Sequence, residues 1–98
     1  MKFLQLFEQA KAIQQKLQEE LDSVEVEASA GGGLVRVKMS GHKTVTALSI
    51  DPGLFSEGDH AMVEDLVRAA VNDATRQVDK TLKKRMGSLG GGLLPGLE

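Results

Sequence analysis

The stretch that decides the fold is residues 60–86, which read HAMVEDLVRAAVNDATRQVDKTLKKRM. It contains neither Gly nor Pro, and its apolar residues recur at steps of three and four, so it predicts one continuous helix with one apolar stripe. At 1.5 Å per residue such a helix is roughly 40 Å long, whereas a compact chain of this size has a radius of gyration of about 13 Å. One end of the helix is therefore expected to project from the body. The stripe consists of Val63, Leu66, Val67, Ala70, Val71, Ala74, Val78, Leu82 and Met86.

A second helix is predicted at the start of the chain, over residues 2–22. Its apolar residues form a heptad-like seam, while Gln, Lys and Glu occupy the opposite face. The seam consists of Phe3, Leu6, Ala10, Ile13 and Leu17.

The segment between the two helices predicts a three-stranded antiparallel meander. Apolar and polar residues alternate over residues 24–28, 35–39 and 44–50, and glycine-containing stretches separate them. Two-residue turns at 31–32 and 41–42 set a register that sorts apolar residues opposite apolar ones and acids opposite bases. The predicted pairs are Val24 with Met39, Val26 with Val37, Glu25 with Lys38, Glu27 with Arg36, Val37 with Thr46 and Val35 with Leu48.

The order of elements predicts an α+β domain over residues 1–86, followed by a Gly-rich flexible tail over residues 87–98. Asp59 is the expected N-cap of the long helix and Gly87 its expected C-cap. The free ends of the two helices are expected to project together and to pack antiparallel as an arm, because their apolar residues would otherwise be exposed. In that arm Phe3, Leu6, Phe7 and Ala10 meet Val78, Leu82 and Met86.

Charge is unevenly distributed between this arm and the rest of the chain. Residues 1–12 and 76–86 hold seven basic and two acidic side chains, a formal charge of +5, and the remainder holds five basic and twelve acidic ones, which brings the whole chain to −2. A field of this kind attracts phosphate. Basic residues also complement a helix C-terminus without binding anything, and the charge pattern leaves both interpretations open. The basic residues of the arm are Lys2, Lys11, Arg76, Lys80, Lys83, Lys84 and Arg85.

Several motifs together give the chain a family resemblance. They are a Gln/Lys-rich first helix, Gly33-Leu34-Val35-Arg36-Val37, Ile50-Asp51-Pro52 and the block Glu64-Asp65-Leu66-Val67-Arg68-Ala69-Ala70-Val71-Asn72-Asp73-Ala74. In this order they resemble the YbaB/EbfC nucleoid-associated proteins. The resemblance implies a tweezer-like homodimer with paired helices as prongs, and a bacterial, cytoplasmic protein of the nucleoid that binds double-stranded DNA with low sequence specificity. The candidate DNA-binding residues come from the charge count and not from the family.

Self-association is expected from size as well, because a chain of 98 residues buries only a modest fraction of its surface. Val45 and Ala47, on the outer face of the predicted sheet, and Val71, at the edge of the helical stripe, are candidate interface residues. The pattern does not choose between these surfaces.

Other chemistry finds little support in the sequence. There is no Cys, and the two His residues are far apart and outside any ligand-spaced cluster, so we expect no metal, no cofactor, no small-molecule substrate and no enzyme activity. No apolar run reaches the roughly 20 residues that span a membrane. All three Phe residues are expected to be buried, which disfavours base stacking on single strands. The alternative function is a protein-interaction or chaperone-like module whose prongs grip a partner chain.

Overall fold

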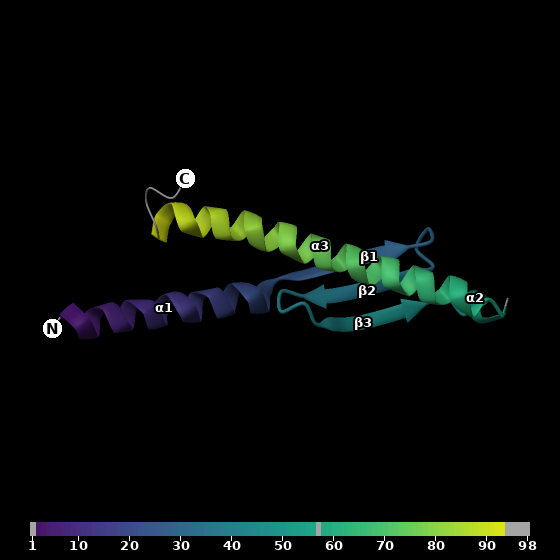
Figure 1. Ribbon diagram of the computed structural model, residues 1–98, viewed down its shortest axis with the longest axis horizontal. Helices are drawn as coiled ribbons and strands as arrows, with labels where there is room; N and C mark the ends of the chain where they lie inside the picture. The colour runs from purple at the N-terminus through teal and green to yellow at the C-terminus, as the bar shows by residue number, and fades with distance from the viewer. Residues whose placement is uncertain (1, 57, 94–98) are drawn as a thin grey trace.

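The computed structural model describes residues 2–56 and 58–93 and has the predicted α+β architecture of helix, meander and helix (Figure 1). The strands form one antiparallel sheet in the order β1-β2-β3, and α3 lies along one of its faces. The elements are α1 (Lys2–Ser23), β1 (Glu25–Ala30), β2 (Val35–Ser40), β3 (Val45–Ile50), α2 (Gly53–Ser56) and α3 (His60–Leu93).

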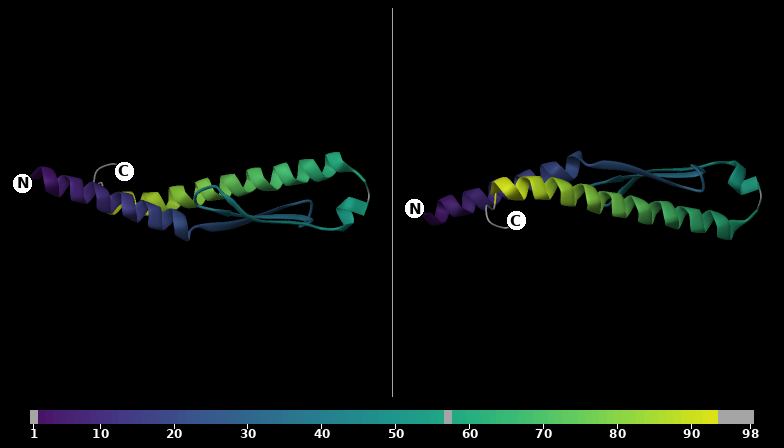
Figure 2. Two further views of the ribbon diagram at one scale, coloured as in Figure 1. Left: turned by 90° about the horizontal axis from the view of Figure 1, so that it is seen from below. Right: turned by 90° about the horizontal axis from the view of Figure 1, so that it is seen from above.

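The molecule is elongated, as the length of the second long helix predicts. It measures 68 × 24 × 17 Å with a radius of gyration of 19.0 Å, well above the value of about 13 Å for a compact chain of this length. The start of α1 and the finish of α3 project toward the same end (Figure 1). The two views of Figure 2 show that the sheet occupies only the other end of the long axis.

The core lies between α3 and the first two strands. Ala70, Ala74 and Val78 recur at steps of four along α3 and are fully buried against the sheet, in the stripe that the sequence predicts. β3 receives little cover, since its residues are exposed up to Ile50. The buried cluster consists of Ala28, Val35, Val37, Met39, Leu54, Ala70, Ala74 and Val78. The short helix α2, which the sequence reasoning missed, adds Leu54 to it.

The predicted register of the first hairpin is wrong by two residues. Val26 pairs with Met39 instead of Val37, and Glu27 pairs with Lys38 instead of Arg36. The reason is the loop: all three glycines of residues 31–33 have positive φ, and the connection runs to residue 34 rather than closing in two residues. A shift of two preserves the faces of the strands. Glu27 therefore still lies opposite a base, whereas Glu25 now lies opposite Ser40.

The second hairpin also differs from its predicted register. Val37 pairs with Leu48 instead of Thr46, and a bulge between Lys38 and Met39 places Val45 opposite Met39. Residues directly opposite share a face of the sheet, so Val45 lies on the helix side, and its predicted place on the outer face is wrong. The left-handed residue of this turn is Lys43 (φ 62°), which lengthens the loop beyond residues 41–42.

The boundaries of α3 are partly as predicted. The Asp59 carboxylate accepts a hydrogen bond from the Met62 backbone N–H (3.1 Å), which makes Asp59 the N-cap. The helix continues to Leu93, however, so the prediction that Gly87 ends it is wrong. Helical hydrogen bonding tolerates Gly at a cost of roughly 1 kcal/mol relative to Ala. The flexible tail predicted for residues 87–98 thus overlaps α3, and its last five residues lie outside the described part of the chain.

The predicted packing of the arm is wrong in detail. Val78 is buried against the sheet, whereas Phe3 keeps 77% of its surface exposed and Leu6 and Phe7 are exposed as well. The two helices diverge in Figure 1, and no residue of α1 is buried. Phe55 is also exposed, so all three Phe residues contradict the prediction that they are buried. The absence of exposed aromatic rings can therefore no longer be used against base stacking.

Candidate nucleic-acid interface

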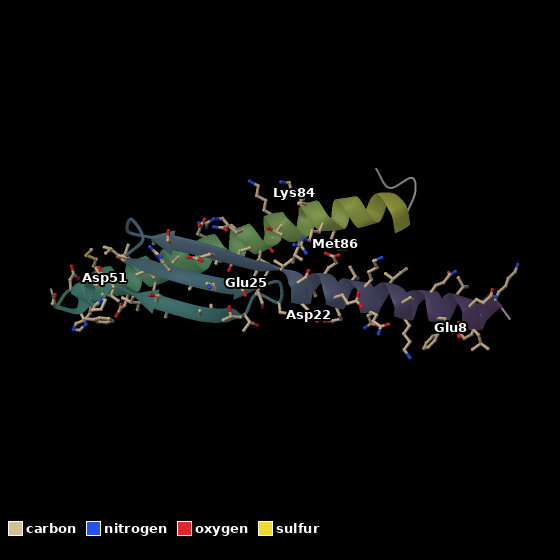
Figure 3. The ribbon with its side chains drawn as sticks, turned by 180° about the vertical axis from the view of Figure 1, so that it is seen from behind. Glu8, Asp22, Glu25, Asp51, Lys84 and Met86 are labelled. Atoms are coloured by element: carbon tan, nitrogen blue, oxygen red, sulfur yellow. The ribbon has the colours of Figure 1, made fainter. Side chains whose placement is uncertain are left out.

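The strongest basic feature is a stripe on the last third of α3, formed by Lys80, Lys83 and Lys84. Steps of three and four place these residues on one face of the helix, and the buried Ala74 and Val78 lie on the opposite face. All three lysines are exposed. Figure 3 shows Lys84 pointing away from both the sheet and α1. The same apolar stripe that holds α3 on the sheet therefore directs these ammonium groups to solvent.

No carboxylate in residues 2–56 or 58–93 lies within ion-pair distance of the three lysines. The ion pairs of this part of the chain instead engage other bases, including Arg76 with Asp73 (3.6 Å) and Arg68 with Asp65 (2.7 Å). We name Lys80, Lys83 and Lys84 the lysine stripe. Its charges are available to an external anion.

Arg85 has a structural role that the sequence reasoning did not anticipate. Its Nη1 donates to the Oε2 atom of Glu20 (3.2 Å) and to the hydroxyl of Ser23 (2.7 Å). It therefore joins the last third of α3 to the end of α1, and its half-buried guanidinium faces away from the lysine stripe. Although it belongs to the Lys-Lys-Arg run, Arg85 is a strut between the helices. Sequence spacing alone offers no signal for a contact between residues 65 positions apart.

Lys43, which the sequence reasoning missed, changes the charge of the arm. Its Nζ lies 2.7 Å from the Oδ1 atom of Asp79, the acid that directly precedes Lys80 in α3. The carboxylate beside the lysine stripe is thus paired with a cation from the β2–β3 turn. Lys43 was an unremarkable turn residue in the sequence, because nothing local points from it to α3.

Lys2 and Lys11 lie on α1, away from the lysine stripe. Both are exposed, on the helix that diverges from α3 (Figure 1). The structure therefore divides the seven predicted residues into three groups. The first is the lysine stripe, with Arg76 one turn earlier on the same side of α3. The second is Lys2 and Lys11 on α1, and the third is the strut residue Arg85.

Three observations on the described part of the chain concern other kinds of site. No group of three or more His, Asp or Glu side chains comes together there to hold a metal ion. Its surface hollows are shallow depressions such as the one of about 350 Å³ on the outer sheet face, lined by Arg36, Lys38 and Ser49 among others. None of the described helices combines the length and apolar character needed to cross a bilayer.

A long helix flanking a three-stranded meander, with a cationic stripe on its projecting end, defines a class of small α+β proteins suited to contact a polyanion. Residues 1–93 match the model of the YbaB/EbfC DNA-binding family, and the chain belongs to this family.

Curated relatives agree with this assignment, and a solved structure shares the fold. A nucleoid-associated protein of Afipia carboxidovorans is 46% identical over 97% of this chain and 94% of its own length. One from Xylella fastidiosa is 48% identical over 96% and 91%, respectively. The crystal structure of an uncharacterized protein from Helicobacter pylori superposes with a TM-score of 0.68, at 24% identity, over 86% of this chain and 98% of that one. The last similarity concerns the fold alone.

Proposed function

We propose that this protein binds double-stranded DNA as a homodimer, through the lysine stripe of α3, with low sequence specificity, and that it acts in nucleoid organisation or gene regulation in the bacterial cytoplasm. The observation that carries the proposal is the set of three exposed ammonium groups without carboxylate partners in the described chain. Lysine contacts to phosphate supply affinity without reading bases. Lys2, Lys11 and Arg76 contribute peripheral charge, while Arg85 acts through helix placement.

The interface proposal is tested by removing the lysine stripe. Replacing Lys80, Lys83 and Lys84 by Gln is expected to weaken binding to unrelated duplexes alike and to reduce the salt dependence by about 0.9 in log–log slope for each lysine that contacts a phosphate. A gel shift or fluorescence anisotropy titration at several salt concentrations measures both.

The matched control replaces Lys16, Arg36 and Lys38 by Gln, which removes the same charge outside the arm. This variant is expected to keep most of the affinity and the slope. Equal losses in the two triple variants would assign binding to net charge rather than to the stripe. Unchanged binding in the stripe variant would refute the assignment of these lysines.

The homodimer is supported by the uncovered helix side of β3. Leu48 lies opposite the buried Val37, and therefore on the same face, yet half of its surface is exposed. Val45 shares this face, as does the partly buried Ile50. We propose that a second copy covers this surface, because it continues the core directly and an apolar patch of this kind favours association.

Two substitutions on neighbouring residues of β3 test this interface. Leu48→Glu places a charge on the helix side and is expected to yield monomers, whereas Ser49→Glu places the same charge on the outer face and is expected to leave dimers intact. Analytical ultracentrifugation at micromolar concentration distinguishes them. A monomeric wild-type protein would remove the homodimer, and dissociation only by Ser49→Glu would move the interface to the outer face.

A second candidate function is a protein-interaction or chaperone-like module. The exposed apolar residues at the tip of α1, Phe3, Leu4, Leu6 and Phe7, favour it. No shift of duplex DNA at micromolar protein and near physiological salt, combined with suppressed aggregation of an unfolded model protein, would support this candidate over DNA binding.

A further inference from the structure

The β2–β3 turn, residues 41–44, lies where α1 ends and where α3 passes over the sheet (Figure 1). Each of its first three residues contacts one of the two helices: Gly41 and His42 contact the end of α1, and Lys43 contacts α3. No other turn of the described chain forms side-chain bonds to both α1 and α3. The turn is thus placed to set the orientation of α1 relative to α3.

Gly41 provides the first contact, which is steric. Its backbone N–H donates to the carbonyl oxygen of Val24 (3.0 Å), immediately after α1. A Cβ at this position would lie within 3.0 Å of the backbone carbonyl oxygen of Leu21, a distance that real Cβ atoms do not show. The buried glycine therefore lets the turn touch the last turn of α1 directly.

His42 and Lys43 provide the second and third contacts. The His42 Nε2 atom lies 2.6 Å from the Asp22 carboxylate of α1, and the Lys43 ammonium lies 2.7 Å from the Asp79 carboxylate of α3. Adjacent side chains of one tight turn thus hold the two helices, whose bonded residues are 57 positions apart in sequence.

The backbone of the turn is set to make these two contacts. Lys43 has a φ of 62°, a left-handed conformation that Gly or Asn adopts more easily. Its N–H donates to the Ser40 carbonyl oxygen (2.9 Å), and the Ser40 hydroxyl accepts hydrogen bonds from the N–H groups of His42 (3.3 Å) and Thr44 (3.4 Å). A strained residue braced in this way points to a constraint on its side chain.

We infer that Gly41, His42 and Lys43 form a clasp that, together with the direct contact of Arg85 to Glu20, fixes the angle between α1 and α3, and that Lys43 also neutralises Asp79 beside the lysine stripe. These are positioning residues: they set where the basic surface of α3 lies relative to the projecting half of α1. The second part of the inference rests on the proposed DNA binding, whereas the first part does not.

Distances between spin labels test the angle. The chain has no native Cys, so Gln9→Cys on α1 and Met86→Cys on α3 give two unique label sites, and an excess of unlabelled protein leaves only distances within one chain. Replacing His42 by Ala and Lys43 by Gln together is expected to broaden the distance distribution severalfold. His60→Ala with Arg68→Gln is the matched control, since it removes a second His and an ion pair confined to α3. An unchanged width in the clasp variant would overturn the inference.

A double-mutant cycle tests the role of Lys43 in DNA binding. Lys43→Gln is expected to weaken duplex binding about twofold to fivefold, which is the range for one exposed charge pair. Asp79→Asn is expected to bind at least as tightly as the wild type, and the double variant is expected to match Asp79→Asn, because no carboxylate then remains to be neutralised. A double variant as weak as Lys43→Gln would show that Lys43 does not act through Asp79. A wild-type protein that fails to bind DNA would refute the proposed function, and the spin-label distances would still decide whether the clasp exists.

Discussion

The two long helices share a sequence pattern but have different surroundings. Both α1 and α3 have apolar residues at steps of three and four. The middle of α3 is fully buried at Ala70, Ala74 and Val78, whereas α1 has no buried residue along its 22 positions. The difference teaches that an amphipathic stripe reports a need for burial and does not identify the surface that meets it.

The same contrast explains why the basic side chains of α3 have a fixed orientation and those at the start of α1 do not. In α3 the sheet fixes the orientation of the helix, so the lysine stripe opposite the core faces solvent. In α1 no comparable contact fixes the first half, and Lys2 and Lys11 lie on the same helix as exposed phenylalanines. A basic surface held by a packed core is the better candidate for binding, because its geometry is set before the partner arrives.

The largest expected difference between the two helices comes from placing a carboxylate on the apolar stripe of each. Ala74→Asp puts an unpaired carboxylate into the core and is expected to destabilise the fold by about 3–5 kcal/mol. Leu6→Asp makes the same kind of change on α1 and, in dilute protein, is expected to alter stability by about 0.5 kcal/mol or less. Urea denaturation followed by circular dichroism measures both. Comparable losses in dilute protein would mean that the α1 stripe is packed within the chain.

A smaller effect is expected at glycines with different surroundings. Gly41→Ala forces a methyl group against the backbone of Leu21, and overpacking of this kind costs about 1–3 kcal/mol. Gly87→Ala meets no atom within 4 Å of the added Cβ, lies within α3, and is expected to stabilise by about 0.5–1 kcal/mol. Thermal melts of the two variants should shift in opposite directions. A neutral Gly41→Ala would show that α1 can move away from the turn at no cost.

The start of α3 provides the third comparison, between two substitutions of its capping residue Asp59. α3 has the Asp59 side-chain cap, so Asp59→Ala is expected to cost about 1 kcal/mol, while Asp59→Asn, which keeps an accepting oxygen, should cost much less. Chemical denaturation resolves this difference. If the Asn variant loses as much as the Ala variant, the carboxylate acts through its charge at the helix start rather than through the hydrogen bond.

The smallest expected effect separates Arg85 from its neighbour in the basic run. Arg85→Gln breaks a partly exposed contact to α1 and is expected to cost less than about 1 kcal/mol. Lys84→Gln removes a charge without a partner in the described chain, so it should leave stability unchanged within about 0.5 kcal/mol. In DNA titrations the order should reverse, with Lys84→Gln showing the greater loss. The same order in both measurements would contradict the division into strut and binding residue.

The sequence predicted the parts of this fold that depend on local periodicity. Alternation and helical spacing identified both long helices, the three strands, and the core face of α3, because each follows from side-chain direction along one element. The register was missed because it depends on the left-handed Lys43 and on the length of the glycine loop. Of the site, exposure of the lysine stripe was predictable, whereas the contacts of Lys43 with Asp79 and Arg85 with Glu20 were not, because they join residues brought together only by the fold.

The position of α3 in the chain has a consequence for how the protein is made. Val78 is the last α3 residue of the described buried cluster, so a ribosome must synthesise about four fifths of the 98 residues before α3 can shield Ala28 and Val37 from water. Until then the apolar face of the meander is exposed, and β3 is uncovered. Exposed apolar faces and unpaired strand edges favour aggregation. Chains that terminate early, before the last third of α3, are therefore expected to be targets for chaperones and proteases rather than shorter working proteins.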